Sequence, residues 1–207
     1  LRATGAGGLV LSGGQFNNNG GTIEALTGST VWLQGGTTIS GGTLGRASGG
    51  EVRTTSGHFA NLDGVSQGTL TIAGNYVAGN ASTTNLSGAI ANTGTLKVDA
   101  GVSVTDLRFA NGTTLTGGGT IRLSDNGNNR VFGVANSGLE VVTNVNNTIA
   151  GSGQFGAGNS VLFKNQVGGL VLADQATALT ITPTTVNTNG QITTNGGGFV
   201  NQGTLRA

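Results

Sequence analysis

Residues 92–98, NTGTLKV, place a turn of Asn, Thr and Gly directly before a run in which apolar and polar residues alternate. The same signature, a Gly followed by Thr and an apolar residue, returns in GGTIEA (20–25), QGTLTIA (67–73), GGGTIRL (117–123) and NQGTLRA (201–207). Gly and Asn favour turns, whereas alternation with period two is typical of a strand with one buried face. Recurrence of this unit predicts a solenoid, in which each repeat adds one coil to a stack.

Composition supports an all-β chain. Of 207 residues, 41 are Gly, 31 are Thr and 22 are Asn, while 35% are hydrophobic, too many for a disordered linker. Apolar pairs flank single outward positions at Leu9/Leu11, Val31/Leu33, Leu70/Ile72, Leu96/Val98, Ile121/Leu123 and Leu205/Ala207. No stretch carries the apolar spacing of a helix over three turns without an interrupting Gly, so we expect no significant helix.

The spacing of the signature predicts the kind of β protein. Its Gly, or the closest equivalent, recurs about every 20 residues, a length that fits three short strands and three turns. These positions are Gly21, Gly42, Gly68, Gly94, Gly119, Gly138, Gly153, Gly169, Gly190 and Gly203. We therefore predict one β-solenoid segment over residues 1–207, a single-stranded parallel β-helix of about nine to ten coils and roughly 45 Å height. The register of residues 124–156 is the least defined.

Side chains suited to a narrow interior predict files of stacked residues. Seven Phe residues are expected to stack inside the helix: Phe16, Phe59, Phe109, Phe132, Phe155, Phe163 and Phe199. Asn side chains at turns are expected to bond along the axis, the best candidates being Asn92, Asn165, Asn187 and Asn201. The single Pro, Pro183, is expected at a corner, where a missing backbone donor is tolerated.

The two ends of the chain share the sequence Leu-Arg-Ala, at residues 1–3 and 205–207. This match predicts one 204-residue period of a longer tandem array. Leu205 would then occupy the inward position that Leu1 has, with Arg2 and Arg206 both pointing outward. No amphipathic or charged capping segment is evident, so we expect adjacent repeat units to associate end to end.

Three segments resemble the β-helical repeats of large bacterial exoproteins, the filamentous-haemagglutinin-like proteins and autotransporter passengers: QFNNNGGTIEA (15–25), NNTIAGSGQFG (146–156) and FVNQGTLRA (199–207). The resemblance implies a right-handed parallel β-helix outside the cell or on the bacterial surface. It also implies a stiff structural or adhesive shaft segment of a giant secreted protein. The alternative is a self-assembling extracellular fibre subunit, and the third hypothesis is a carbohydrate-active or ice-binding β-helix.

The sequence contains few residues suited to catalysis or to metal binding. The single His, His58, could pair with Asp63 and act on a nearby Ser. However, no nearby Ser lies in a Gly-x-Ser-x-Gly nucleophile elbow, so the sequence favours His58 as a turn residue without a catalytic role. Arg46, Glu51, Arg53, His58 and Asp63 form the closest charged set, for which a surface charge network is favoured over an active site. With no Cys and scattered acids, we expect no catalytic residue, no metal site, no cofactor and no enzymatic activity.

The net charge and the aromatic residues limit the classes of partner expected for this chain. Nine basic and eight acidic residues give a net charge of +1, which argues against nucleic acid, and no apolar run is long enough to span a membrane. Trp32 and Tyr76 are candidate partner-binding residues for surface glycans or proteins, with burial under packed chain as the alternative for both. Thr-x-Thr pairs suggest ice binding, yet they do not return on every coil; they occur at Thr69/Thr71, Thr93/Thr95 and Thr182/Thr184.

Overall fold

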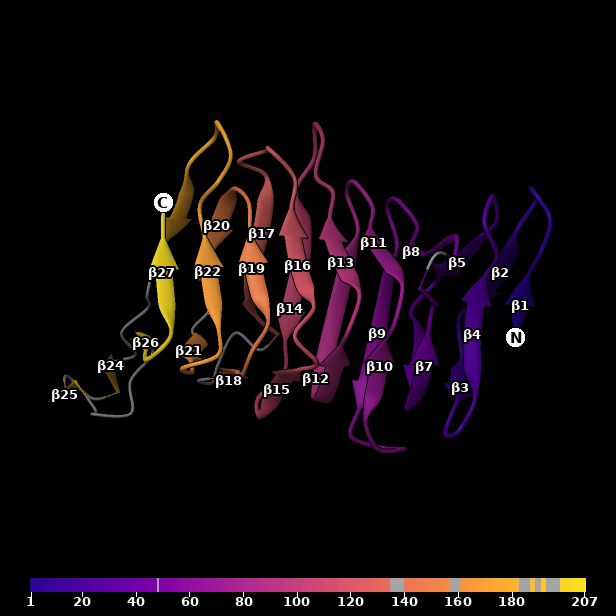
Figure 1. Ribbon diagram of the computed structural model, residues 1–207, viewed down its shortest axis with the longest axis horizontal. Helices are drawn as coiled ribbons and strands as arrows, with labels where there is room; N and C mark the ends of the chain where they lie inside the picture. Colours follow the sequence, from indigo (N-terminus) through magenta and orange to yellow (C-terminus); the bar gives the residue numbers. More distant parts are fainter. Residues whose placement is uncertain (48, 135–139, 157–160, 183–186, 189–190, 193–197) are drawn as a thin grey trace.

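The chain is a β-solenoid of stacked parallel strands, as the sequence predicts. The computed structural model describes residues 1–47, 49–134, 140–156, 161–182, 187–188, 191–192 and 198–207. In these residues all regular secondary structure is strand, without a helix. The coils follow one another along the long axis, from the N-terminal coil at one end to the C-terminal coil at the other (Figure 1).

The strands form three faces, which the chain visits in the order 3, 1, 2. Face 1 is a nine-stranded sheet of β2 (Leu9–Ser12), β5 (Thr30–Gln34), β8 (Glu51–Thr54), β11 (Asn75–Ala78), β13 (Thr95–Val98), β16 (Thr120–Leu123), β19 (Thr148–Ala150), β22 (Leu170–Leu172) and β27 (Thr204–Arg206). Face 2 contains β3 (Gln15–Asn17), β6 (Thr37–Ser40), β9 (Phe59–Gly64), β14 (Thr105–Phe109), β17 (Asn129–Gly133), β20 (Gly153–Phe155) and β23 (Leu179–Ile181). Face 3 contains β1 (Arg2–Ala3), β4 (Thr22–Ala25), β7 (Gly42–Leu44), β10 (Leu70–Ile72), β15 (Thr113–Thr116), β18 (Glu140–Asn144), β21 (Val161–Asn165) and β26 (Gly198–Asn201).

One long strand joins two of these faces. β12 (Thr83–Asn92) begins on face 2 and ends on face 3, so both belong to one sixteen-stranded sheet. A short antiparallel pair, β24 (Asn187–Thr188) and β25 (Gln191–Ile192), departs from the parallel arrangement and was not predicted. The sequence left the register of residues 124–156 undefined; the described residues 124–134 and 140–156 continue the parallel ladders through β17 to β20.

The stack has fewer coils than the nine to ten predicted, because the coils are longer. Between register partners on face 1, a coil takes from 20 residues (Tyr76 to Leu96) to 34 residues (Val171 to Leu205). At about 4.8 Å between neighbouring strands, the nine strands of this face span roughly 38 Å. The rod is therefore somewhat shorter than expected.

The Gly-Thr-apolar signature marks two different corners, which explains the overestimate. Gly21 and Gly68 precede strands of face 3, whereas Gly94, Gly119 and Gly203 precede strands of face 1. The signature thus moves from one corner to the next along the chain. Counting it as one position per coil gives a spacing shorter than the true coil.

The same shift corrects the interpretation of the repeated Leu-Arg-Ala. β1 carries Arg2 and Ala3 on face 3, whereas β27 carries Leu205 and Arg206 on face 1. The predicted equivalence of Leu205 and Leu1 is therefore wrong, since a true period would return the chain to the same face. Leu205 follows the inward register of the buried Val171, as predicted, although its side chain is 53% exposed on this last strand of face 1.

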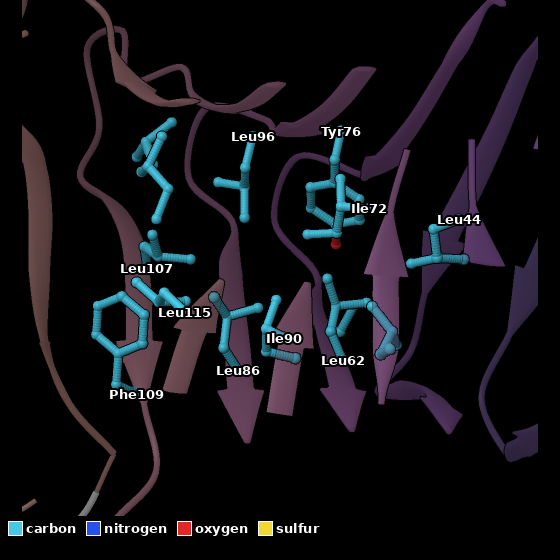
Figure 2. Packing of buried hydrophobic residues seen from close by; sticks show 14 of the residues in the cluster. Leu44, Leu62, Ile72, Tyr76, Leu86, Ile90, Leu96, Leu107, Phe109 and Leu115 are labelled. Atoms are coloured by element: carbon cyan, nitrogen blue, oxygen red, sulfur yellow. The ribbon is translucent and has the colours of Figure 1, made fainter. Parts of the chain in front are cut away.

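Inward side chains from the three faces meet in one continuous core (Figure 2). Each strand contributes alternate residues, so Leu62, Leu86 and Phe109 follow one another on face 2 in successive coils. Complete burial of a Leu or Ile side chain stabilises a fold by about 1.5 to 3 kcal/mol. Because the same contact recurs coil after coil, the core extends along the rod.

The phenylalanines are divided between the interior and the surface. Phe155, Phe163 and Phe199 form one internal cluster, with ring centroids 4.7 Å, 5.4 Å and 5.9 Å apart. Phe109 is buried and Phe16 packs against the core, as predicted. Two others contradict the prediction that all seven lie inside: Phe59 is 50% exposed, and Phe132 lies against two arginines on the outside. Each adjoins an inward residue, so period two turns it outward.

Asparagine ladders run along the inside of the corner between faces 3 and 1. Asn165 Nδ2 donates to Asn201 Oδ1 at 2.9 Å, and Asn92 Nδ2 donates to Asn147 Oδ1 at 2.9 Å. The predicted stacking is confirmed for Asn92, Asn165 and Asn201, while Asn144 and Asn147 are members that the sequence did not reveal. The side chain of Asn187, like the whole of Pro183, lies outside the described residues.

Candidate functional site

A groove of about 400 Å³ opens on the outside of face 2. Its lining is formed by Thr38, Asn61, Asp63, Val65, Asn85, Leu86, Ser87, Ala110 and Val134. β9 directs Asn61 and Asp63 outward, because the intervening Leu62 is a core residue. β12 places Asn85 beside Asn61 and Ser87 beside Asp63 in exact parallel register. Two successive coils thus present polar side chains on one floor.

A row of amides crosses this floor along the axis. Asn85 Nδ2 donates to Asn61 Oδ1 at 2.8 Å, and Asn61 Nδ2 donates to Thr38 Oγ1 at 3.1 Å. The Oδ1 atom of Asn85 is buried and has no hydrogen-bond partner. An unpaired buried oxygen is costly, so the row has one acceptor left to satisfy.

Asp63 supplies the negative charge of the groove. Its Oδ1 accepts from Val65 N at 2.7 Å and from Ser87 Oγ at 3.2 Å, and its Oδ2 accepts from Ser40 Oγ at 3.1 Å. Burial alone would raise the pKa of Asp63, but the hydrogen bonds from Ser66, Val65 and Ser40 together outweigh burial and lower the pKa below its ordinary value. The carboxylate is therefore ionised at neutral pH.

Apolar residues form the walls, and an aromatic ring lies on the same strand. Val65 and Val134 are 67% and 39% exposed, and Ala110 completes this apolar part of the lining. Phe59 points outward on β9 like Asn61 and Asp63, and its ring covers Gly36 of the preceding coil. The surface thus offers a ring, amides and a carboxylate in one line.

An ion cluster adjoins the groove on the following coils. Arg108, the register partner of Asn85, donates to Asp106 Oδ2 at 2.6 Å, and Arg130 donates to Asp106 Oδ1 at 2.7 Å. Both guanidinium groups lie against the ring of Phe132, at 5.0 Å and 5.3 Å from its centroid. Asp106 is only 3% exposed, so the two arginines enclose its charge and cover this part of face 2.

Face 1 carries paired charges around the predicted site residue Trp32. Trp32 points outward from β5 as predicted, is half-buried, and has the Arg53 guanidinium 5.4 Å from its ring. Arg53 pairs with Glu51 at 3.4 Å and Lys97 with Asp99 at 3.0 Å. A partner-binding role for Trp32 remains a prediction.

Tyr76 lies in the core rather than on the surface. Its side chain is 1% exposed and points into the interior shared with Ile72 and Leu62 (Figure 2). Its hydroxyl oxygen lies 2.6 Å from Thr54 Oγ1, and burial raises its pKa to about 12 against the opposing hydrogen bonds from Thr54 and Thr84. The sequence left burial open as the alternative for Tyr76, and the structure shows that Tyr76 is buried. Its assignment as a surface partner-binding residue is therefore corrected.

The charged residues singled out from the sequence do not form one site. His58 Nδ1 accepts from Gly35 N at 3.3 Å at the start of β9, whereas Asp63 lies five residues further on, about 16 Å away along the strand. Arg46 pairs with Glu24 at 3.6 Å, which assigns it to another surface pair. Among the described residues, no group of three or more His, Asp or Glu could hold a metal ion.

Threonines gather on the outside of face 3. Thr71 lies in register with Thr43 on one side and Ala91 on the other, and Ala91 in turn with Thr116. Thr95, in contrast, belongs to face 1. The Thr-x-Thr pairs found in the sequence are therefore distributed over different faces, and Thr184 lies outside the described residues.

Neither a protein-family model, nor a curated protein, nor a solved structure matches this chain. The β-solenoid of stacked parallel strands is consistent with a β-helical repeat. In the described part of the chain there is no helix of the length and apolarity that crossing a membrane requires.

Sequence reasoning missed most of the groove, although a signal was present. The tetrapeptide NLDG at residues 61–64 returns as NLSG at residues 85–88. The structure stacks these eight residues pairwise, Gly64 on Gly88 included. A search for short repeats one coil apart, rather than for catalytic motifs, would have brought Asn61, Asn85 and Ser87 together.

Proposed function

We propose that this chain is a segment of a stiff, adhesive shaft in a large bacterial protein that is secreted or held at the cell surface. The observation that carries the proposal is the parallel pairing that runs through the described strands of all three faces, from β1 to β26, from β2 to β27 and from β3 to β23. A rod built in this way keeps its two ends at a fixed separation and orientation. It holds surface groups at a fixed distance from whatever anchors it.

Stiffness follows from three sets of bonds that all run along the axis. Backbone hydrogen bonds join each coil to the next, the core is continuous, and asparagine amides link successive coils inside one corner. Bending the rod would stretch all three together on its convex side. A close-packed interior resists such deformation, since it has few voids to absorb it.

The adhesive part of the proposal rests on the outward residues. They alternate with the core residues along every strand, so they are free of the packing constraints that fix the interior. On face 2 they form a groove with a polar floor, whereas on face 1 they form ion pairs. The extracellular bacterial setting is supported by the resemblance to exoprotein repeats.

Surface labelling of intact cells tests the proposal. Antibodies raised against this segment should decorate unpermeabilised bacteria that express the native protein, with immunogold particles displaced outward from the envelope. Labelling that requires permeabilisation would contradict the shaft. The runner-up, a fibre of separate subunits, predicts instead that denaturing electrophoresis of labelled surface material releases short chains rather than one very large polypeptide.

A further inference from the structure

We propose that the groove on face 2 is a binding site for neutral sugars, in which the polar floor around Asp63 holds the hydroxyls of one pyranose ring and Phe59 stacks against a second. This inference rests on the adhesive role proposed above and names its ligand. The groove is neither the site of Trp32, which lies on face 1, nor a metal centre, because only one carboxylate is among its described lining residues.

The floor has the hydrogen-bonding capacity that a sugar needs. Vicinal sugar hydroxyls both donate and accept hydrogen bonds. A carboxylate accepts from them, and neighbouring hydroxyl and amide groups can both donate and accept. Asp63 Oδ1 is occupied by backbone donors and Ser87, whereas Oδ2 accepts from Ser40, which leaves the greater acceptor capacity on Oδ2. Ser87 Oγ directs its proton to Asp63 and so presents lone pairs to a ligand.

The amide row adds a second contact. Asn85 Oδ1 has no partner in the protein, although its Nδ2 is bound to Asn61. Because Asn85 lines the groove, a sugar hydroxyl that donates to this oxygen would satisfy it. A ligand that provides the missing donor is thereby favoured over an apolar ligand of the same size.

The walls and dimensions fit a pyranose. A volume of about 400 Å³ lies within the range of small-molecule sites, roughly 300 to 1,000 Å³. Val65 and Val134 offer apolar surface to the C–H groups of a ring whose hydroxyls point to the floor. Phe59 lies four residues from Asp63 on β9, about 13 Å away, so a short oligosaccharide along the strand would reach both.

Charge selects neutral over acidic sugars. Asp63 is the ionised group among the described residues of the lining, and it would repel a uronate carboxylate placed beside it. The neighbouring Arg108 and Arg130 direct their Nε and Nη2 donors to Asp106. They are therefore engaged by their own counter-ion.

The test has two steps. A printed array of neutral and acidic oligosaccharides is first probed with the purified chain, and methyl glucoside and glucuronate are then titrated as a matched pair with the same ring. We expect neutral glycans to bind and glucuronate to bind at least about tenfold more weakly than methyl glucoside. Absence of binding to every neutral glycan, or preference for acidic ones, would overturn the proposal.

Paired variants locate the site. Asp63→Asn keeps the oxygen that accepts from Val65 N, so the turn is retained while the charge is lost, and binding should weaken about 10- to 100-fold. Asp99→Asn is the control, because it makes the same change at an ion pair on face 1. Asn85→Ala and its control Asn75→Ala, at an exposed position on face 1, are compared in the same way.

The loss of sugar binding can be distinguished from a loss of folding and from failure of the proposed shaft function. Far-ultraviolet circular dichroism and the urea midpoint report whether each variant is folded. Unchanged affinity in folded Asp63→Asn and Asn85→Ala would show that sugars bind elsewhere and would reject this groove. That result would not change the surface labelling of intact cells, so the sugar-binding proposal can be rejected while the shaft proposal is retained.

Discussion

Asn165 donates its amide hydrogen to Asn201 Oδ1 at 2.9 Å while its own Oδ1 accepts from Asn144 Nδ2 at 2.9 Å. Three successive coils of face 3 are thus joined by side chains as well as by backbone. Asn165 is 1% exposed, and its bond to Asn144 is buried, whereas its bond to Asn201 is partly buried. Hydrogen bonds in such surroundings polarise one another along the row. The ladder is a structural element of the rod in its own right.

Truncation of the central asparagine should therefore destabilise the chain. We expect Asn165→Ala to lower the free energy of unfolding by about 2 to 3 kcal/mol, because it removes both amide bonds and leaves one Nδ2 hydrogen of the buried Asn144 without its acceptor. Asn75→Ala, at an exposed position, should change it by less than about 0.5 kcal/mol. Urea unfolding measures both variants. Equal midpoints would show that the ladder contributes nothing to stability.

The enclosed carboxylate on face 2 gives a second prediction. Asp106→Asn keeps the shape of the side chain but leaves Arg108 and Arg130 facing each other without an anion. We expect a loss of about 1 to 3 kcal/mol in the free energy of unfolding. Asp99→Asn at the exposed pair with Lys97 should lose no more than about 1 kcal/mol. The prediction fails should the two substitutions prove equally mild.

A glycine under an aromatic ring gives a third. Gly36 has φ +80°, and a Cβ added there would lie 2.6 Å from Phe59 Cζ, whereas Gly28 has the same φ and open space. Gly28→Ala should lose about 1 to 2 kcal/mol from backbone strain alone, and Gly36→Ala more. In a Phe59→Ala background, Gly36→Ala should fall to the loss seen for Gly28→Ala. Thermal unfolding of the parent, the three single variants and the double variant completes the comparison, and persistence of the excess loss without Phe59 would assign it to another cause.

How much of this could be predicted from the sequence depends on the range of the interaction. Alternation around Leu70 and Leu96 predicted strands, because the period of two is local. Coil count was wrong because the Gly-Thr signature marks a corner without saying which one, as the different faces of Gly68 and Gly94 demonstrate. Corner identity is set by how many residues each loop takes, and loops tolerate length changes with little effect on the core.

The candidate groove was less predictable than the fold. Asn61 and Asn85 are 24 residues apart and meet only because that separation equals one local coil. Tyr76 was misplaced because an aromatic residue between turn residues resembles an exposed one, while its burial depends on the hydroxyls of Thr54 and Thr84 from neighbouring strands. In both cases the deciding contact is between coils, and the coil length must be known before such a contact can be inferred.

The buried hydroxyl of Tyr76 leads to a prediction about alkaline pH. Its folded pKa, about 12, lies above the ordinary value of 10.0, so folding favours the neutral phenol. The corresponding stability, on the order of 2 to 3 kcal/mol, is fully present below pH 10 and is lost as pH rises toward and through 12. Because the chain has one Tyr, tyrosinate absorbance follows this residue alone.

Tyr76→Phe separates this effect from other alkaline titrations. Thr54 and Thr84 can bond to each other at 2.8 Å, so the variant should lose no more than about 1.5 kcal/mol at neutral pH. Between pH 10 and 12 the parent should lose stability faster than the variant in urea unfolding, since lysine and arginine titrate equally in both. Parallel curves, or tyrosinate absorbance rising near pH 10 while the circular dichroism of the folded chain persists, would mean that the phenol is open to water. The buried position of Tyr76 would then be wrong, and with it the hydroxyl network that joins β8, β11 and β12 inside the core.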